Sequence, residues 1–176
     1  MRIIAGKYRA KKLNFPQKET IRPTSDMVKQ AMFTTLFDKV EACFFLDLFC
    51  GSGQVGIEAL SRGANKVVFV DNDMEAIAVT KKNLTNIQGN FEIFKMHYAP
   101  FLRLTKDKFD LIFVDPPYQS DYYKEVLDLI VKNDLLKEHG MIICEHNSND
   151  EIKHDEFVLV QTKKYGIKSL SYFQKA

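Results

Sequence analysis

Short apolar runs alternate with longer amphipathic segments along most of the chain. The apolar runs predict strands over residues 44–49, 66–70, 91–95, 109–114, 141–145, 157–162 and 168–173. Amphipathic spacing predicts helices from residues 24 to 38, from the glycine-rich turn at 51–56 to about 63, and over 73–86 and 121–132. Strands that are apolar throughout and separated by helices are typical of a parallel sheet covered on both faces. The last two strands, which flank Lys164-Tyr165-Gly166, predict a closing antiparallel hairpin.

The amino-terminal segment differs from the rest in charge. Residues 1–22 carry seven basic side chains against one acidic side chain, a net charge of +6, and because the whole chain has a net charge of +2 the remainder is −4. Residues 2–15 mix apolar and charged positions around Gly6, which predicts a short β-hairpin. We therefore expect a basic arm over 1–22 and one compact unit over 23–176. The asymmetry favours an anionic polymer as partner, although a solvated, solubilising tail explains the charge alone equally well. Candidate RNA-binding residues are Arg2, Lys7, Arg9, Lys11, Lys12 and Arg22.

Composition narrows the class of protein further. With 45% hydrophobic and 27% charged residues, the chain is typical of a globular domain. It has no run of about 20 apolar residues, and its first residues lack the apolar centre of a signal peptide, which predicts a cytoplasmic protein without a membrane partner. The three cysteines form no Cys-x-x-Cys pair, and the four histidines never stand four residues apart, so we expect no metal.

A glycine-rich loop follows the first strand of the main unit. Gly51-x-Gly53-x-x-Gly56 opens the next helix, and glycine at these positions lets a ligand approach the backbone and the free helix amides. Asp71 ends the following strand, where a carboxylate can accept hydrogen bonds from both hydroxyls of a ribose. The pattern predicts a nucleoside-containing cofactor and leaves NAD and S-adenosylmethionine open.

A second motif, Asp115-Pro116-Pro117-Tyr118, follows the fourth strand, which should neighbour the first strand at the switch point of the sheet. The lone pair of an exocyclic amine on a nucleobase is delocalised into the ring. An acidic oxygen and a backbone carbonyl that hold the amine hydrogens free that lone pair for attack. Two prolines make a stiff turn that can present the Pro116 carbonyl, and Tyr118 can stack on an extruded base. The motif therefore indicates methylation of an amino group, with S-adenosylmethionine as the donor.

These motifs resemble a known family. Asp47-Leu48-Phe49-Cys50-Gly51-Ser52-Gly53 together with Asp115-Pro116-Pro117-Tyr118 is similar to the amino-group methyltransferases that use S-adenosylmethionine. A closer resemblance, to the bacterial RsmD family, extends over essentially the whole chain and rests on Arg2-Ile3-Ile4-Ala5-Gly6, Arg22-Pro23-Thr24-x-Asp26-x-Val28-Lys29-x-Ala31-Met32-Phe33, Gly56-Ile57-Glu58-Ala59-Leu60-Ser61-Arg62-Gly63 and Lys164-Tyr165-Gly166.

The resemblance implies a Rossmann-like class I S-adenosylmethionine-dependent methyltransferase, with a mostly parallel seven-stranded sheet, a closing antiparallel hairpin and an amino-terminal basic β-hairpin and helix. It implies that the substrate is a guanine N2 of 16S rRNA, within a 30S subunit or an assembly intermediate, and we expect a monomer. Gly51, Ser52 and Gly53 would line the methionine part of the cofactor, Asp71 the ribose, and 115–118 the target base. The candidate cofactor residues are Asp47, Gly51, Ser52, Gly53, Asp71, Asn72, Tyr98 and Ala99.

One position departs from the family pattern. The family has Asp or Asn next to Ala after the third strand, where this chain has His97-Tyr98-Ala99, so we expect no side-chain contact from there to the adenine amino group, and a backbone contact stays open.

We expect in-line attack of the guanine amine on the sulfonium methyl, with Asp115 and the Pro116 carbonyl holding the amine hydrogens. The chain has no Pro-Cys dipeptide for covalent catalysis, and we interpret Cys50 as a small residue packed beside the cofactor. Core positions are expected for Phe33, Phe37, Phe44 and Phe45.

Three alternatives stay open. A DNA amino-methyltransferase would share both motifs, an NAD-dependent oxidoreductase would share the glycine loop and Asp71, and a non-catalytic RNA-binding ribosome assembly factor would keep the fold.

Overall fold

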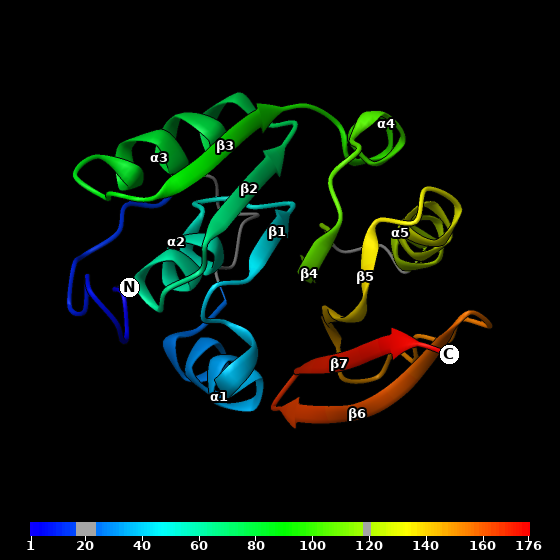
Figure 1. Ribbon diagram of the computed structural model, residues 1–176. Helices are drawn as coiled ribbons and strands as arrows, with labels where there is room; N and C mark the ends of the chain where they lie inside the picture. The colour runs from blue at the N-terminus through cyan, green and yellow to red at the C-terminus, as the bar shows by residue number, and fades with distance from the viewer. Residues whose placement is uncertain (17–23, 118–120) are drawn as a thin grey trace.

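The computed structural model describes residues 1–16, 24–117 and 121–176, and within them the chain alternates strands and helices (Figure 1). The strands are β1 (Phe44–Leu48), β2 (Lys66–Asp71), β3 (Asn90–Lys95), β4 (Phe109–Val114), β5 (Leu136–Asn147), β6 (Phe157–Tyr165) and β7 (Lys168–Lys175). The helices are α1 (Asp26–Leu36), the 3₁₀ turn η1 (Phe37–Lys39), α2 (Gln54–Ser61), α3 (Met74–Leu84), α4 (Tyr98–Leu104) and α5 (Asp121–Lys132).

The strands form one sheet in the order β3-β2-β1-β4-β5-β7-β6. The first five strands in this order are parallel, and β7 is antiparallel to both β5 and β6. Strand order reverses between β1 and β4, where Leu48 pairs with Val114, so the loops after these two strands leave the sheet side by side. This arrangement confirms the predicted mixed seven-stranded sheet with its closing hairpin.

Two apolar layers cover the sheet. Side chains of α1, α2 and α3 pack with Phe45, Phe69 and Phe113 on one face. Side chains of α4 and α5 pack with Leu46 and Ile112 on the opposite face, and Figure 1 shows the two groups of helices on opposite sides of the strands. Because successive strand residues point to opposite faces, each strand end presents one residue to each layer.

The amino-terminal segment forms a short, tightly turned hairpin. Arg2 and Lys12 form an antiparallel bridge with turns between them, and the amide of Ile3 donates to the carbonyl of Lys11 (2.9 Å). Ile3 and Leu13 are buried in the main core. Glu58 of α2 also holds the segment, because it accepts hydrogen bonds from the backbone amides of Ile4 (2.8 Å) and Ala5 (3.0 Å). Docking onto a helix therefore adds to strand pairing as a source of order.

Three sequence expectations need correction. Residues 98–104 form a short helix, α4, that was not predicted. Strand β5 begins at Leu136 and not at 141, with a register shift in its pairing with β4. Phe37 is 84% exposed, because α1 ends at Leu36 and the 3₁₀ turn that follows directs this ring away from the core, whereas Phe33 and Phe45 are buried as expected.

Candidate active site

A cavity of about 980 Å³ opens at the carboxyl ends of the parallel strands. Its walls come from the loops after β1, β2, β3 and β4, from the end of β5 and from the turn between β6 and β7. The switch point between β1 and β4 lies in this wall, as expected for a ligand site in an open α/β sheet. The glycine loop and the acidic diproline turn therefore face one common space.

Asp71 shapes the glycine loop. One of its carboxylate oxygens accepts a hydrogen bond from the amide of Gly51 (2.9 Å), and the other accepts one from the amide of Asp73 (2.9 Å). Each carboxylate oxygen can accept a second hydrogen bond, so the side chain keeps capacity for a diol. Gly51 has a φ of 55°, and a Cβ built there would meet nothing within 4 Å. The backbone at Gly51 is thus open to a ligand.

The other two glycines of the motif serve the fold. Gly53 has a φ of 72°, and an added Cβ would lie 2.8 Å from the Thr80 side chain. At Gly56 an added Cβ would lie 2.3 Å from the ring of Phe69, so this glycine lets α2 approach β2. The amide of Gly56 donates to Asp47 (2.8 Å), whose burial raises the pKa of that carboxyl to about 8. Asp47 is therefore a buried acid at the floor of the cavity.

Most of the predicted cofactor residues lie around the cavity. Its lining includes Asp47, Gly51, Ser52, Asp71, Asn72 and Tyr98. Gly53 and Ala99 do not line it, since Gly53 packs on Thr80 and Ala99 is buried within α4. Cys50 also lines the cavity, and burial, reinforced by Asp47 and Asp71, raises the pKa of its thiol well above the ordinary value. The structure thus places a protonated thiol beside the glycine loop.

Aromatic rings form the wall that follows β1 and β3. The ring of Tyr98 lies 5.1 Å from that of Phe49 and 5.5 Å from that of Tyr122, and its hydroxyl donates to Glu125 (2.6 Å). Burial and this carboxylate raise the pKa of Tyr98, so its hydroxyl stays protonated. His97 is exposed next to it, and Phe49, His97 and Tyr122 all line the cavity. These rings offer a flat apolar surface of the kind that a nucleobase can stack on.

The acidic diproline turn forms another part of the wall. Asp115, Pro116 and Pro117 line the cavity, with Pro116 buried and Pro117 exposed, while Tyr118 lies outside the described residues. Burial raises the pKa of Asp115 well above the ordinary value, the neighbouring Glu145 carboxylate raises it further, and the ammonium of Lys168 opposes both effects. Asp115 is therefore placed in a corner where its charge depends on its neighbours.

Sequence reasoning missed a group of polar residues in this wall. Gln54 donates to the carbonyl of Thr24 (3.1 Å), and the Thr24 hydroxyl donates to Glu145 (2.7 Å), which also binds Lys168. The Gln54 side-chain oxygen is buried and has no hydrogen-bond partner among the residues that the structure describes. The one sequence signal available was the position of Gln54 directly after Gly53 in the glycine-rich turn, where α2 begins.

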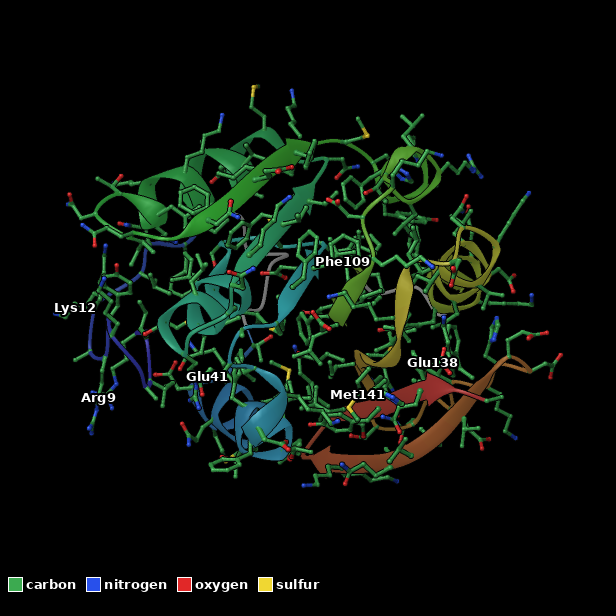
Figure 2. All side chains as sticks on the ribbon, in the orientation of Figure 1. Arg9, Lys12, Glu41, Phe109, Glu138 and Met141 are labelled. Carbon is green, nitrogen blue, oxygen red and sulfur yellow. The ribbon has the colours of Figure 1, made fainter. Side chains whose placement is uncertain are left out.

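The basic arm lies away from the cavity. Its described side chains line none of the cavity wall, and Figure 2 shows Arg9 and Lys12 pointing outward from the amino-terminal segment. Lys7 donates to the side chain of Gln88 (3.1 Å), and Lys11 donates to the carbonyl of Thr85 (2.6 Å), so part of the arm is fastened near the end of α3. Arg2 is also exposed, whereas Arg22 lies outside the described residues.

The described part of the chain offers neither a metal cluster nor a membrane span. Within residues 1–16, 24–117 and 121–176, no group of three or more His, Cys, Asp or Glu residues is arranged to hold a metal ion. The helices of these same ranges are all too short or too polar to cross a bilayer.

The chain is similar to a known protein family and to individual proteins over nearly its whole length. The family model described as Conserved hypothetical protein 95 matches residues 1–174. The chain belongs to this family. A Bacillus subtilis protein named "Putative rRNA methyltransferase YlbH" is 34% identical over 99% of both chains. The Ribosomal RNA small subunit methyltransferase D of Haemophilus influenzae is 33% identical over 99% of this chain and 93% of its own length. Together, the family model and these relatives confirm the resemblance to the RsmD family.

Solved structures show the same relationship. "Putative methyltransferase yhhF from Escherichia coli" superposes with a TM-score of 0.88 at 28% identity, over 99% of this chain and 97% of its own. The agreement confirms the predicted Rossmann-like class I methyltransferase fold.

The cavity of this family member fits S-adenosylmethionine. The open backbone at Gly51 leaves room beside the glycine loop, and Asp71 retains acceptor capacity for ribose hydroxyls. The orphaned oxygen of Gln54 is a buried acceptor that suits an N–H donor such as the methionine ammonium. The ring wall at Phe49 and Tyr98 suits the adenine. These residues are complementary to the groups that S-adenosylmethionine carries.

Proposed function

We propose that this chain transfers a methyl group from S-adenosylmethionine to the exocyclic N2 of a guanine in 16S rRNA. One observation carries the proposal: Asp71, the glycine loop and the acidic diproline turn line a single cavity at the switch point of the sheet. Relatives named as rRNA methyltransferases over nearly the whole chain support rRNA as the substrate class.

Each part of the cavity has a role in this proposal. Asp47, Gly51, Ser52, Asp71 and Asn72 bind or shape the site of the cofactor, while Gly53 and Ala99 act through the backbone that they position. Asp115, Pro116, Pro117 and Tyr118 hold the target guanine. The basic arm over 1–22 binds RNA phosphates outside the cavity, and residues 23–176 form the methyltransferase unit. We take a 30S subunit or an assembly intermediate as the substrate and a monomer as the active form.

Orientation supplies most of the rate acceleration in this mechanism. S-adenosylmethionine, when bound, would supply an electrophilic sulfonium methyl group. The guanine amine attacks this carbon in line as the carbon–sulfur bond breaks, S-adenosylhomocysteine leaves, and the methylated nitrogen releases one proton to water. Asp115 accepts a hydrogen bond from the amine, and the Pro116 carbonyl accepts the other, so that the nitrogen lone pair is freed from the ring. Fixing two reactants in line removes much of the entropic cost of their encounter.

Transfer of labelled methyl groups tests the proposal. Naked 16S rRNA, 30S particles and plasmid DNA are offered with labelled S-adenosylmethionine, and the modified nucleoside is identified after nuclease digestion. We expect N2-methylguanosine in one RNA substrate. Label in DNA alone would instead identify a DNA amino-methyltransferase, and tight RNA binding without transfer would identify an assembly factor.

An Asp115→Ala variant tests the assigned role. We expect kcat to fall at least about 100-fold, as when one group that stabilises a transition state is removed. Cofactor affinity measured by calorimetry should stay within a few-fold of wild type. Asp128→Ala is the matched control, because Asp128 is exposed on α5 and binds Lys124 and His154 outside the cavity. Retained turnover in Asp115→Ala would contradict the role.

A further inference from the structure

Asp115 shares its corner of the cavity with a second carboxylate. Val114 pairs with Cys144, so Asp115, which follows Val114, comes next to Glu145, which follows Cys144. Phe113 and Ile143 point into the core layer of α1 and α2. Since strand residues alternate between faces, Asp115 and Glu145 point to this same side. The two acids therefore lie on neighbouring strand ends and on the same face.

Strand β7 brings a cation to the same place. Glu145 pairs with Leu170, and Lys168 stands two residues from Leu170 and hence on the same face. The Lys168 ammonium donates to one oxygen of the Glu145 carboxylate, and its side chain is 19% exposed. Both residues line the cavity together with Asp115.

Glu145 is held in place by two other elements. The Thr24 hydroxyl, just before α1, donates to the second carboxylate oxygen of Glu145 (2.7 Å), and the Tyr123 hydroxyl of α5 donates to the Glu145 carbonyl. The Glu145 side chain is only 1% exposed. Glu145 is thus held at its carboxylate by Thr24 and at its backbone carbonyl by Tyr123. The Lys168 ammonium therefore binds a fixed carboxylate, unlike the ammonium of a mobile surface ion pair.

We propose that Lys168, anchored by Glu145, is a positioning residue that favours the ionised form of the Asp115 side chain in methyl transfer. This inference rests on the proposed function, since it assigns to Lys168 and Glu145 a role in that reaction. An ionised carboxylate only accepts hydrogen bonds. A protonated carboxyl could donate its proton to the amine lone pair, which is the pair that must attack the methyl group.

Other charges around Asp115 set the direction of the effect. Glu145 on β5 and Asp47 on β1 disfavour ionisation, Lys168 on β7 favours it, and Tyr123 on α5 also interacts electrostatically with Asp115. Loss of the ammonium therefore raises the pKa of Asp115, and loss of the Glu145 charge lowers it. An opposite charge at close range shifts the pKa of a carboxyl by about 1 to 3 units.

The pH dependence of the rate constant for methyl transfer, measured in single turnovers, tests the inference. We expect this rate constant to rise with pH through one apparent pKa in the wild type. Lys168→Met should move this rise upward by at least about one pH unit, so that a more alkaline solution is needed to reach the same rate. Lys168→Arg should restore the wild-type position. Glu145→Gln should move the rise to lower pH, because the amide oxygen of glutamine can still accept a hydrogen bond from Lys168 while the negative charge that disfavours ionisation of Asp115 is lost. Lys175→Met is the matched control, because Lys175 lies on the same strand and pairs with Asp134 outside the cavity.

Carbon NMR of the labelled aspartate carboxyls gives a second measurement that needs no turnover. The Asp115 resonance is assigned with Asp115→Asn, and its pKa should rise in Lys168→Met and fall in Glu145→Gln. If wild type transfers no methyl group, the proposed function fails, while the titration still decides whether Lys168 controls Asp115. Unshifted titration curves, or pH profiles that change only in height, would overturn the inference.

Discussion

Glu58 offers the sharpest test of how the basic arm is fixed to the methyltransferase unit. Its carboxylate is fully buried on α2 and receives the backbone amides of Ile4 and Ala5, the Arg62 guanidinium (2.8 Å) and the Lys29 ammonium (3.5 Å). The Lys29 side chain is also fully buried, and its desolvation lowers the pKa of this amine while Glu58 opposes that shift. We consider the substitution Glu58→Gln, which keeps the shape and removes the charge.

The expected loss of stability in Glu58→Gln follows from the number of hydrogen-bond and charge partners that glutamine cannot satisfy. It keeps one acceptor oxygen and places an N–H donor where the second oxygen accepted hydrogen bonds, so donors of the arm or of Arg62 lose their partner. Lys29 and Arg62 also lose their buried counter-charge. Removing one partner of a buried ion pair costs about 3 to 5 kcal/mol, which is a large part of the roughly 5 to 15 kcal/mol that stabilises a typical domain.

Urea unfolding measures this loss as a fall in midpoint at constant slope. Trypsin adds a local measurement, since Arg9, Lys11 and Lys12 should be cleaved faster once the arm detaches. The matched control is Glu92→Gln, which breaks the exposed pair of Glu92 with Lys66 and should cost less than about 1 kcal/mol. The double variant Lys29→Met with Glu58→Gln should recover part of the loss, because it leaves one fewer unpaired charge. If Glu58→Gln costs no more than Glu92→Gln, the buried carboxylate does not anchor the arm.

Two further predictions concern charge. The pKa of Asp47 is about 8 in the native protein and 3.8 ordinarily, so folding takes up a proton between these pH values and the free energy of unfolding falls as pH rises. Asp47→Asn removes this effect, and its stability relative to wild type should therefore increase from pH 4 to pH 8. Urea unfolding at several pH values measures the difference, and parallel stability curves for the two proteins would contradict the prediction. Replacing Arg9, Lys11 and Lys12 with Gln should weaken RNA binding. It should also reduce the slope of log affinity against log salt by about 0.7 for each phosphate that the arm no longer neutralises. The control replaces the exposed cations Lys124, Lys132 and Lys153 with Gln and should leave this slope unchanged.

The elements that the sequence predicts well are those whose signal lies within one segment. Strand β4 was predicted at its observed bounds because its apolar run ends at the acidic turn. Helix α4 was missed although Tyr98, Phe101 and Leu102 have helical spacing, because the segment is one of the shortest helices of the described residues and contains Pro100. At residues 2–15, the apolar pattern predicted the antiparallel pairing that Arg2 and Lys12 show, but it did not predict the burial of Ile3 and Leu13 in the main core or the hydrogen bonds to Glu58. Those contacts are made with distant parts of the chain, and alternation alone does not specify which partner buries an apolar face.

The same limit explains which part of the candidate site was foreseen. The glycine loop and the acidic turn are each contiguous, so their residue types and order carry the chemistry. The neighbours of Asp115 reach it through strand register and helix docking: Thr24 lies 121 positions from Glu145 in the chain, and Lys168 lies 23 positions from it. A shift of one residue between β5 and β7 would turn Lys168 to the opposite face of the sheet. The charged neighbours Glu145 and Lys168 are therefore brought to Asp115 by the pairing of β4, β5 and β7, and no motif that contains Asp115 can encode their positions.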